Sequence, residues 1–335
     1  MRIKEPLQIK ELVLNNRIVM PPMASENTKD GLVHPEHFPY YTDRTDAGQI
    51  GLVITEHMYV HIHGKASEGQ LSIADDSCID GLSQLTAAIK RGGAKVFAQL
   101  NHAGSGAPEG LTGRVPMGPS PVFNPYKSRT SGIPEEMSHE QLFALRQVYA
   151  DAALRAKAAG YDGVEIHAAH SYLLDQFYSP ILNRRHDEYG VDSVENRVRL
   201  HVELIRAVRE AVGEDYPIAM RFGGCDYMEG GSTIEDCAQA CKLLEAAGVD
   251  IIDLSGGLCN FTPKEADGNV RTGVLFEDMA KAVKAVVKVP VILTGGIRDA
   301  ETAERLLADG LCDLVGIGRS LLKDPKWPAN QVYNN

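Results

Sequence analysis

Residues 138–167 are S-H-E-Q-L-F-A-L-R-Q-V-Y-A-D-A-A-L-R-A-K-A-A-G-Y-D-G-V-E-I-H, and this stretch contains the unit from which the chain is built. Its first part predicts a helix over 138–159, because Ser138 and Gln141 have the spacing of a capping box and Gly160 is a natural helix stop. Its last part, residues 162–167, is a short apolar run that predicts a buried strand. Helix and strand in immediate succession are typical of α/β proteins.

The same alternation extends along the chain. Seven further short apolar runs predict strands at 16–20, 51–55, 94–100, 217–221, 250–254, 290–293 and 313–316. Helical patterns lie at 78–90, 194–212, 233–247, 276–287 and 300–308. Eight such strands favour a (β/α)8 TIM barrel that forms a single domain over residues 1–335. A doubly wound sheet is the alternative, disfavoured because no Gly-x-Gly-x-x-Gly follows the first strand.

The most irregular segment is 101–137, where six glycines and six prolines fall within 37 residues. It follows the third predicted strand, on the face where barrels carry their active sites. Long irregular loops are uncommon in compact domains unless they are functional. We therefore expect a lid or capping excursion over that face, with a plain surface excursion as the alternative.

Composition and charge narrow the possible partners. The chain has 34 basic and 45 acidic residues, a net charge of -11, which disfavours nucleic acid and anionic membrane surfaces. Neither a signal-peptide pattern nor a run of 18 apolar residues occurs, so we expect a cytoplasmic protein. The six cysteines are scattered, which suits reduced thiols. Only Cys237 and Cys241 are close in sequence, and one pair is a poor metal signal.

Large polar residues end three consecutive predicted strands, at Gln99, His167 and Arg221. Each follows an apolar run in which a purely structural strand would need no such group. Side chains at the C-terminal ends of barrel strands meet at one mouth. Although a single buried polar residue is usually structural, three on neighbouring strands indicate a site.

A second imidazole and a phenol follow at His170 and Tyr172. Two neutral histidines can donate hydrogen bonds to one oxygen, and a nearby tyrosine can supply a proton. The pattern therefore favours oxyanion stabilisation with a general acid. Zinc binding by His167 and His170 is the alternative, and it would need a third ligand. The candidates for that ligand are His57, His61 and His63.

Glycines end the seventh and eighth predicted strands, as Gly295-Gly296 and as Gly318 followed by Arg319. Glycine lets backbone N–H groups approach a phosphate, and an arginine offers a fixed fork to its oxygens. This is the usual phosphate position of a barrel. The pattern predicts a phosphate-bearing ligand, with tight strand–helix turns as the structural alternative.

Eight stretches occur in a characteristic order. They are N-N-R-I-V-M-P-P-M at 15–23, G-L-V-I-T-E at 51–56, Q-L-N-H-A-G at 99–104, E-I-H-A-A-H-S-Y-L-L-D-Q-F at 165–177, S-P-I-L-N-R-R-H-D-E-Y-G at 179–190, V-E-N-R at 194–197, T-G-G-I at 294–297 and G-I-G-R-S-L-L-K-D-P-K-W-P at 316–328. At these spacings the set resembles the Old Yellow Enzyme family of flavin-dependent ene-reductases over nearly the whole chain.

The resemblance implies noncovalently bound FMN, reduced by NADH or NADPH, that passes hydride to the β-carbon of an α,β-unsaturated carbonyl substrate. It implies that His167 and His170 bind the substrate carbonyl and that Tyr172 protonates the α-carbon. The residues that it places around the flavin are Pro22, Met23, Ala24, His57, Gln99 and Arg221, with Gly295, Gly296, Gly318 and Arg319 at the phosphate. Among these, Gln99 would bond the pyrimidine edge and Arg221 would lie near N1 and the C2 carbonyl.

Two positions depart from the family pattern. Ala24 replaces a Thr or Cys that relatives often carry beside the flavin, so flavin tuning is expected to differ. His57 replaces a small Ala or Gly, and its imidazole either points away or adds a contact in the pocket. No cysteine follows Cys312, where longer relatives carry a four-cysteine iron-sulfur motif, so the resemblance implies direct reduction by the nicotinamide. It leaves the oligomeric state open.

Two further hypotheses stay open at the level of sequence. The phosphate-site glycines alone would also suit a flavin-free, phosphate-binding barrel lyase or isomerase. Ala24 and His57 would suit a flavin-binding protein without catalysis, although His167, His170 and Tyr172 argue against that. The sequence specifies neither the alkene nor the choice between NADH and NADPH.

Overall fold

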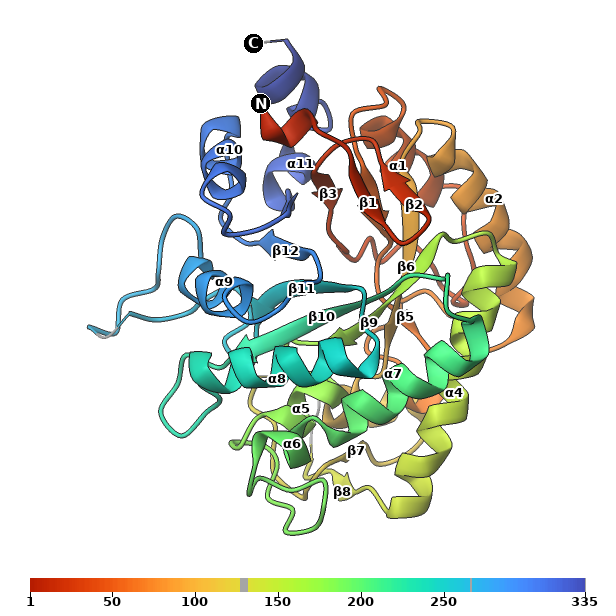
Figure 1. The fold of residues 1–335 in the computed structure, drawn as a ribbon. Coiled ribbons are helices and arrows are strands. Elements are labelled where there is room, and N and C mark those ends of the chain that lie inside the picture. The colour runs from red at the N-terminus through yellow and green to blue at the C-terminus, as the bar shows by residue number, and fades with distance from the viewer. Residues whose placement is uncertain (127–131, 266, 335) are drawn as a thin grey trace.

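Eight parallel strands close into a barrel in the computed structural model, which describes residues 1–126, 132–265 and 267–334 (Figure 1). The strands are β3 (Ile18–Met20), β4 (Leu52–Ile54), β6 (Lys95–Asn101), β9 (Gly163–Ala168), β10 (Ile218–Cys225), β11 (Ile251–Gly256), β12 (Val291–Thr294) and β13 (Leu314–Gly316). Pairing of β13 with β3 closes the barrel. All eight predicted strands are present, and the predicted TIM barrel is confirmed.

Helices surround the strands. Those predicted from the sequence are α2 (Ile79–Lys90), α4 (His139–Ala158), α6 (Val194–Arg197) with α7 (Arg199–Val212), α8 (Ile234–Ala247), α9 (Glu277–Lys284) and α10 (Ala300–Ala308). The predicted capping box of Ser138 and Gln141 starts α4. The helix predicted over 194–212 is instead two helices, because Val198 has a ψ of 3° and leaves the helical range.

Shorter elements were not predicted from the sequence. They are the strands β1 (Leu7–Ile9), β2 (Leu12–Leu14), β5 (Met58–Tyr59), β7 (Met117–Gly118) and β8 (Glu135–Glu136), and the helices α1 (His37–Thr45), α3 (Glu109–Thr112), α5 (Leu173–Tyr178) and α11 (Arg319–Lys323). The structure also has 3-10 turns at Arg2–Lys4, Ile62–Gly64, Asp76–Cys78 and Gly104–Gly106, and a π-helix at Ala329–Tyr333. Most of these elements span six residues or fewer, which is too short to show a helical period in a sequence.

The barrel interior and the shell outside it form two separate apolar cores. Along each strand, alternate side chains face inward or outward, so neighbours belong to different cores. The inward core contains Ile9, Leu14, Val19, Leu52, Ile54, Phe97, Ala219, Ile251, Ile292 and Leu314. Ile9 and Leu14 come from the antiparallel β1–β2 hairpin, which therefore packs against the inward core. Polar inward-facing residues follow only further along the strands, toward their C-terminal ends.

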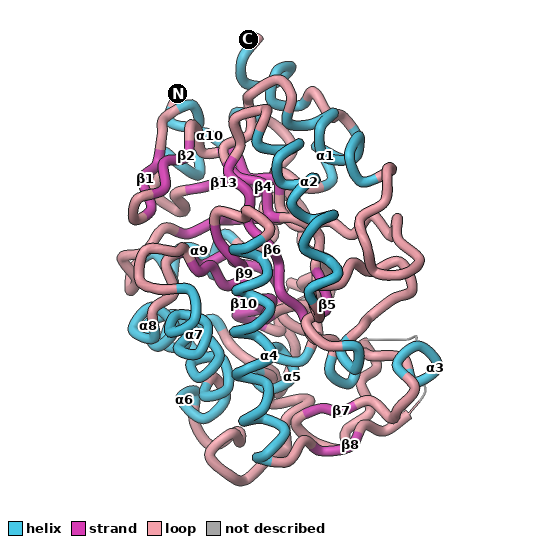
Figure 2. Tube along the Cα trace, turned by 90° about the vertical axis from the view of Figure 1, so that its right-hand side faces the viewer, coloured by secondary structure: helices cyan, strands magenta, loops and turns pink. Residues whose placement is uncertain are grey.

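The excursion 101–137 leaves β6 and returns at α4. Its two short strands, β7 and β8, pair with each other and lie near α3, away from both chain ends (Figure 2). Its irregular backbone agrees with its glycine and proline content. The lid role stays a prediction, and residues 127–131 of the segment lie outside the described residues. The assignment of 1–335 to one domain also stays a prediction.

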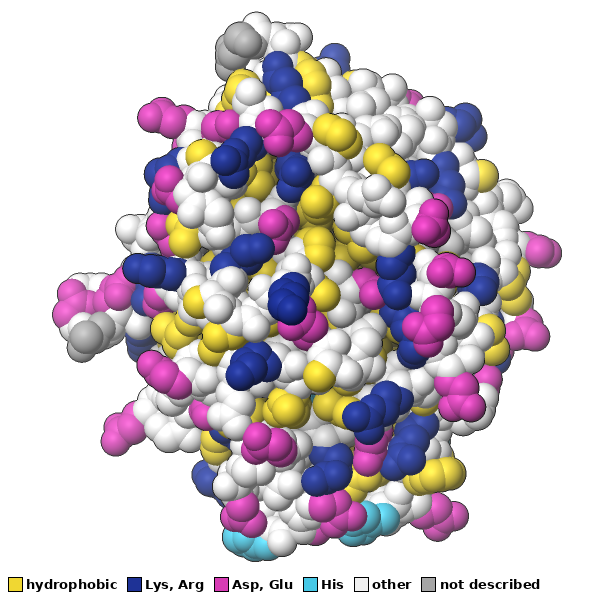
Figure 3. Space-filling model, in the orientation of Figure 1, with side chains coloured by type: hydrophobic (Ala, Val, Ile, Leu, Met, Phe, Trp, Pro, Cys, Tyr) yellow, Lys and Arg dark blue, Asp and Glu magenta, His cyan; other side chains and the backbone are white. Residues whose placement is uncertain are grey.

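The surface agrees with the charge analysis on the face that Figure 3 shows. There, basic and acidic side chains are interspersed, and neither sign gathers into a large area. In the part of the chain that the structure describes, no helix combines the length and the apolar character needed to cross a membrane.

Substitution of Phe97 tests how much the inward core contributes to stability. Its ring is fully buried on β6, and Gly163 on β9 leaves the room for it, because a Cβ there would lie 2.6 Å from the ring. We expect Phe97→Ala to lower the free energy of unfolding by about 3–5 kcal/mol through lost burial and a cavity. Phe143→Ala is the control, since Phe143 is 65% exposed on α4 and should change stability by no more than about 0.5 kcal/mol. Urea unfolding curves measure both, and equal effects would contradict this account of the core.

Candidate active site

A cavity of about 850 Å³ opens at the C-terminal ends of the barrel strands. This volume lies within the usual range for small-molecule and cofactor sites. All thirteen residues predicted from the sequence line it: Pro22, Met23, Ala24, His57, Gln99, His167, His170, Tyr172, Arg221, Gly295, Gly296, Gly318 and Arg319. The closed barrel thus brings together residues that are almost 300 positions apart in the sequence.

Gln99 is held by a neighbouring carboxyl group in the cavity wall. Strands β6 and β9 place Gln99 opposite Glu165, and the Gln99 amide nitrogen donates to Glu165 Oε1 over 2.8 Å. Burial, together with the nearby Asp253 carboxylate, raises the pKa of Glu165 well above its ordinary value. Because the Gln99 NH₂ group is used in this way, its carbonyl oxygen is the atom offered to a ligand. Gln99 can therefore accept a hydrogen bond from an N–H group in the cavity.

Arg221 is a buried cation in the same wall, only 2% exposed. It lies opposite Asp253 on β11, with 3.5 Å between Arg221 Nε and Asp253 Oδ2. Thr294 donates to the other Asp253 oxygen over 3.2 Å. Burial raises the pKa of Asp253 to about 6, against the opposing effect of Arg221.

The Arg221 guanidinium can form further hydrogen bonds. Within the described residues its buried Nε has no hydrogen-bond partner, and the Phe261 ring lies 6.0 Å from the guanidinium carbon. A buried cation with one loose ion pair is costly unless a further partner compensates for lost water. This arrangement therefore fits a ligand that presents carbonyl oxygens or negative charge to Arg221.

His167, His170 and Tyr172 form an aromatic group at the end of β9. The His167 ring lies 5.1 Å from the His170 ring and 5.2 Å from the Tyr172 ring, centroid to centroid. His170 Nε2 lies 2.7 Å from Ser255 Oγ at the end of β11, which fixes the orientation of that imidazole. The three polar groups can thus reach one small ligand from one side.

The turn that carries these residues has an unusual backbone. His170 and Ser171 have φ values of 59° and 56°, in the left-handed region that residues other than glycine seldom adopt. Two amides stabilise the turn, because the Ser171 carbonyl accepts from Asn124 Nδ2 over 3.3 Å and from Gln176 Nε2 over 2.7 Å. Asn124 belongs to the 101–137 excursion, so this excursion supports the turn that presents Tyr172.

The two positions that depart from the family pattern both line the cavity. Ala24 contributes only a methyl group. The His57 imidazole does not point away, because its ring lies 5.5 Å from the Tyr172 ring and 6.3 Å from the His167 ring. His57 therefore adds a polar group beside the three residues of the β9 turn.

The other end of the cavity is basic and lined by glycine. Gly296 has a φ of 80°, which favours glycine, and a Cβ on Gly318 would lie in contact with Pro21 and Met23, 3.6 and 3.8 Å away. Arg319 at the start of α11 is joined there by two further cations, Arg298 and Lys323. Positive charge together with accessible backbone N–H groups suits a phosphate.

Sequence reasoning missed several residues that build this site. Glu165 lies two residues before His167 on β9, and Asp253 lies on β11, two strands away from β9. Both face the inside of the barrel, and both support cavity residues. Their signal was present, because an acidic side chain inside an apolar strand run needs a partner. Ser255 and Asn124 gave no such signal, since their partners lie 85 and 47 residues away in the sequence. Gln176 lies only five residues from Ser171, but no motif predicts this contact.

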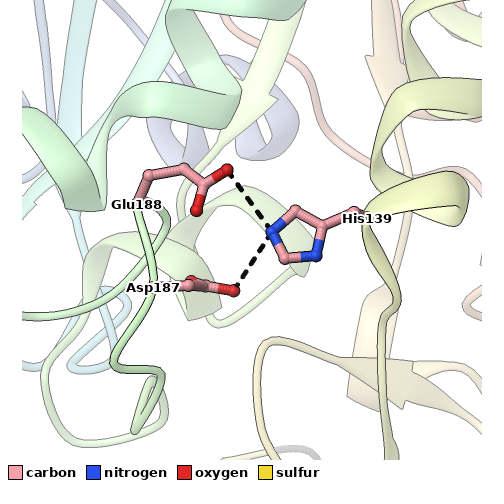
Figure 4. Close-up of side chains that lie close together, drawn as sticks. All are labelled: His139, Asp187 and Glu188. Atoms are coloured by element: carbon pink, nitrogen blue, oxygen red, sulfur yellow. Dashed lines mark ion pairs between the residues drawn. The ribbon is translucent and has the colours of Figure 1, made fainter.

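One group of possible metal ligands lies outside the cavity. Among the described residues, only His139, Asp187 and Glu188 bring three ligand atoms within 4.8 Å of one another (Figure 4). Both carboxylates lie 3.4 Å from His139 Nε2, and Arg185 Nε already donates to Asp187 over 3.0 Å. This group is a surface ion cluster at the start of α4. The zinc alternative for His167 and His170 gains no third ligand from the described residues.

Comparison with known proteins agrees with the fold. Residues 2–334 match the model of the NADH:flavin oxidoreductase / NADH oxidase family. The chain is 41% identical to an NADH oxidase of Thermoanaerobacter brockii over 96% of its own length, and it spans 49% of that protein. It is 40% identical to an NADPH dehydrogenase of Bacillus licheniformis, covering 96% of this chain and 91% of that one.

A solved structure shows the same fold. The structure of the old yellow enzyme homologue from Zymomonas mobilis superimposes with a TM-score of 0.85 at 26% identity. The match covers 98% of this chain and 91% of the other. The similarity therefore includes the whole barrel.

Substitution of Asn124 tests whether this side chain stabilises the turn at residues 170–172. Asn124→Ala removes one of two donors to the Ser171 carbonyl, together with the contacts of Asn124 to Ser105 Oγ and the Tyr126 N–H. We therefore expect a loss of about 1–2 kcal/mol in stability and faster amide exchange at residues 170–172. Asn15→Ala is the matched control, because the exposed Asn15 amide also donates to one carbonyl, that of Gly93, over 3.2 Å. Hydrogen exchange followed by mass spectrometry measures the effect. Unchanged exchange at 170–172 in the Asn124 variant would contradict the supporting role.

Proposed function

Because this chain belongs to the NADH:flavin oxidoreductase / NADH oxidase family, we propose that it uses NADH or NADPH to reduce the activated C=C bond of α,β-unsaturated carbonyl compounds through bound FMN. One observation carries this proposal. A single cavity joins a basic, glycine-lined end to a group of imidazole and phenol side chains, with the buried Arg221 in its wall. A flavin-free lyase or isomerase would need the basic, glycine-lined end, but it has no evident use for the imidazole and phenol group or for Arg221.

The residues present fit noncovalently bound FMN. Gly295, Gly296, Gly318 and Arg319 would hold the phosphate, and the Gln99 carbonyl would accept from an N–H of the pyrimidine edge. Arg221 would supply positive charge to the carbonyl-bearing edge of the ring, and its Nε has no hydrogen-bond partner among the described residues. Pro22, Met23 and Ala24 would pack against the ring system. When bound, FMN supplies two-electron chemistry, accepting hydride from a nicotinamide and giving it to an alkene.

His167 and His170 would bind the substrate carbonyl oxygen. Hydride arrives at the β-carbon, and the π electrons of the C=C bond shift toward that oxygen. Two imidazole N–H donors become stronger partners as the oxygen gains negative charge, so they stabilise the transition state more than the ground state. Ser255 would keep His170 oriented for this task, because its hydroxyl lies 2.7 Å from the other side of the ring.

Tyr172 would complete the addition. Its phenol donates a proton to the α-carbon, the C–H bond forms as the enolate electrons return, and solvent then restores the tyrosine proton. The result is one hydride and one proton added across the C=C bond. The rigid turn at 170–172 would hold the hydroxyl near the α-carbon, and the neighbouring His167 and His57 rings restrict its rotation.

FMN content is the first test. We expect the purified protein to be yellow and to release about one FMN per chain on heating. Gly318→Val should weaken FMN binding at least tenfold, because the added side chain would occupy the space beside Pro21 and Met23. Gly110→Val is the control, since a Cβ there meets nothing within 4 Å. Absorbance and fluorescence titration with FMN measure both. A colourless protein that takes up no added FMN would favour the lyase or isomerase alternative.

The role of Tyr172 is tested by separating the two half-reactions. Tyr172→Phe should leave flavin reduction by NAD(P)H unchanged, because that step needs no proton from the phenol, while slowing flavin oxidation by weakly activated enones by about 10²- to 10⁴-fold. With a nitroalkene the variant should still transfer hydride but release the nitronate unprotonated. Tyr126→Phe, a tyrosine whose hydroxyl contacts Met228, is the control. Anaerobic stopped-flow absorbance measures each step, and an unchanged oxidative rate would mean that another group is the acid.

A further inference from the structure

A second cavity, of about 1160 Å³, lies outside the candidate active site, and among the described residues the two share no lining residue. Its lining residues come from three loop segments, 26–29, 65–69 and 108–111, which follow the barrel strands β3, β4 and β6. Loops that follow parallel strands emerge at the same face of a barrel. The second cavity therefore lies on the face that carries the candidate active site, and the 101–137 excursion forms one of its walls.

Gln70 separates the two cavities. The backbone N–H of Ala66, which lines the second cavity, donates to Gln70 Oε1 over 2.6 Å. At the other end of the same amide, Gln70 Nε2 lies 2.7 Å from Nδ1 of His57, which lines the first cavity. Gln70 itself is 2% exposed. The two cavities are thus neighbours divided by a buried side chain, and a ligand of the second cavity has its own binding surface.

Lys65 is a nearly buried cation in the wall of the second cavity, with 7% of its surface exposed. Lysine is almost never buried to this degree unless it is paired. Within the described residues, however, its ammonium forms no ion pair and donates no hydrogen bond, and Nζ lies 5.4 Å from the centre of the Tyr59 ring. An aromatic ring compensates a desolvated cation less than a carboxylate does. In the described part of the protein, Lys65 therefore lacks a counter-ion.

The two buried hydroxyl groups in the same wall already have acceptors. Thr28 Oγ1 donates to Asp30 Oδ1 over 3.0 Å, and Ser67 Oγ donates to Glu26 Oε1 over 2.8 Å. Because a hydroxyl has one proton, neither group has a donor left for a ligand. Among the buried side chains that line this cavity, it is Lys65 that offers donors to a bound molecule.

The other charged side chains of the wall are exposed. They are Glu26, Lys29, Glu68 and Glu109, three acidic groups and one basic group. The nearly buried ammonium attracts one negative charge strongly, because little water screens it. The acidic rim repels any second negative charge at low ionic strength. The arrangement therefore favours a ligand with a single negative charge.

We propose that the second cavity is a binding site for a small organic monoanion whose carboxylate pairs with the Lys65 ammonium. The volume is that of a site for an organic molecule, since a single inorganic ion would leave most of it to water. The half-buried Pro108 and Leu111 provide an apolar wall for the rest of the ligand. A phosphate monoester or a nucleotide carries more than one negative charge and suits the acidic rim poorly. The site does not depend on the function proposed above.

The role of the charge is tested with a matched pair of ligands. Cyclohexanecarboxylate and cyclohexanecarboxamide have the same shape, but only the first is an anion. In isothermal titration calorimetry of the protein as purified, at low ionic strength, we expect the carboxylate to bind about tenfold or more tightly than the amide, because a charge-assisted hydrogen bond is the stronger one. No binding of the carboxylate, or equal binding of the two, would overturn the proposal.

The role of Lys65 is tested by substitution. Lys65→Met keeps an unbranched side chain without the charge, and it should weaken carboxylate binding about tenfold or more, to the level of the amide. Lys65→Arg should keep the affinity within about threefold, because it keeps the charge. Lys29→Met is the matched control, since it removes an exposed lysine from the same wall and should change the affinity by no more than about twofold. Unchanged affinity in Lys65→Met would mean that another group binds the carboxylate.

Urea unfolding distinguishes loss of the site from loss of the fold. Replacing an unpaired buried charge with an apolar side chain removes a desolvation cost, so Lys65→Met should unfold at a urea concentration no lower than the wild type. Cyclohexanecarboxylate should raise the unfolding midpoint of the wild type but not that of the variant. A lower midpoint for Lys65→Met without ligand would show that the protein itself compensates the charge, and the proposal would then be wrong.

The acidic rim is tested with a second carboxylate on the ligand. Cyclohexane-1,4-dicarboxylate should bind the wild type about threefold or more weakly than the monocarboxylate, and the double variant Glu68→Gln, Glu109→Gln should remove most of this difference. Tighter binding of the dicarboxylate by the wild type would contradict the assignment of the ligand as a monoanion.

Discussion

Alternation of side chains along eight closed strands is the constraint on which the rest of this structure depends. Each inward-facing position must be filled, because a closed barrel has no edge through which water can solvate its interior. The inward core meets this demand with apolar side chains such as Phe97 and Ile292, together with Ile9 and Leu14 of the β1–β2 hairpin. Polar inward-facing groups are then confined to the C-terminal ends of the strands, where the cavity opens.

Burying polar groups inside a barrel requires that each be compensated. Arg221 has the Asp253 carboxylate opposite it, and Gln99 has Glu165. Burial, together with the Asp253 carboxylate, raises the pKa of Glu165, and burial also raises the pKa of Asp253 against the effect of Arg221. In the same layer of the barrel, the Arg221 guanidinium and the Gln99 carbonyl oxygen can still form hydrogen bonds with a ligand in the cavity. The carboxyl partners that make burial of Arg221 and Gln99 possible therefore also orient these two groups toward a ligand.

The outer wall of the site depends on contacts made from the side. The left-handed turn at His170 and Ser171 is held by amides of Asn124 and Gln176, and His170 is oriented by Ser255. The described part of the 101–137 excursion thus does more than cross the surface, because it supplies Asn124. Beside this turn, Gln70 orients the His57 ring, because Gln70 Nε2 lies 2.7 Å from His57 Nδ1. In both places an amide outside the cavity fixes a polar group within it.

Sequence alone determined the features that repeat or that stand out chemically. Eight apolar runs alternating with helical patterns indicated the barrel, because parallel strands buried on both faces have nearly continuous apolar runs. Gln99, His167 and Arg221 were visible as polar strand ends, and the glycines with Arg319 as a phosphate pattern. The family resemblance added Pro22, Met23 and Ala24, and all of these residues line the cavity. Short elements such as β1 and α5 could not be predicted, because a few residues carry no reliable period.

Only the tertiary structure decided which distant residues support these groups. Glu165 and Asp253 could be suspected as acidic residues in apolar runs, but their pairing with Gln99 and Arg221 depends on strand register. The direction of the His57 ring was undecided in the sequence, since the contact that fixes it comes from Gln70, thirteen positions away, in a loop whose path no local pattern specifies. Side-chain identity limits what chemistry a site can perform. The hydrogen-bond partners that set protonation and orientation are chosen by the fold, because they depend on distances that sequence spacing does not contain.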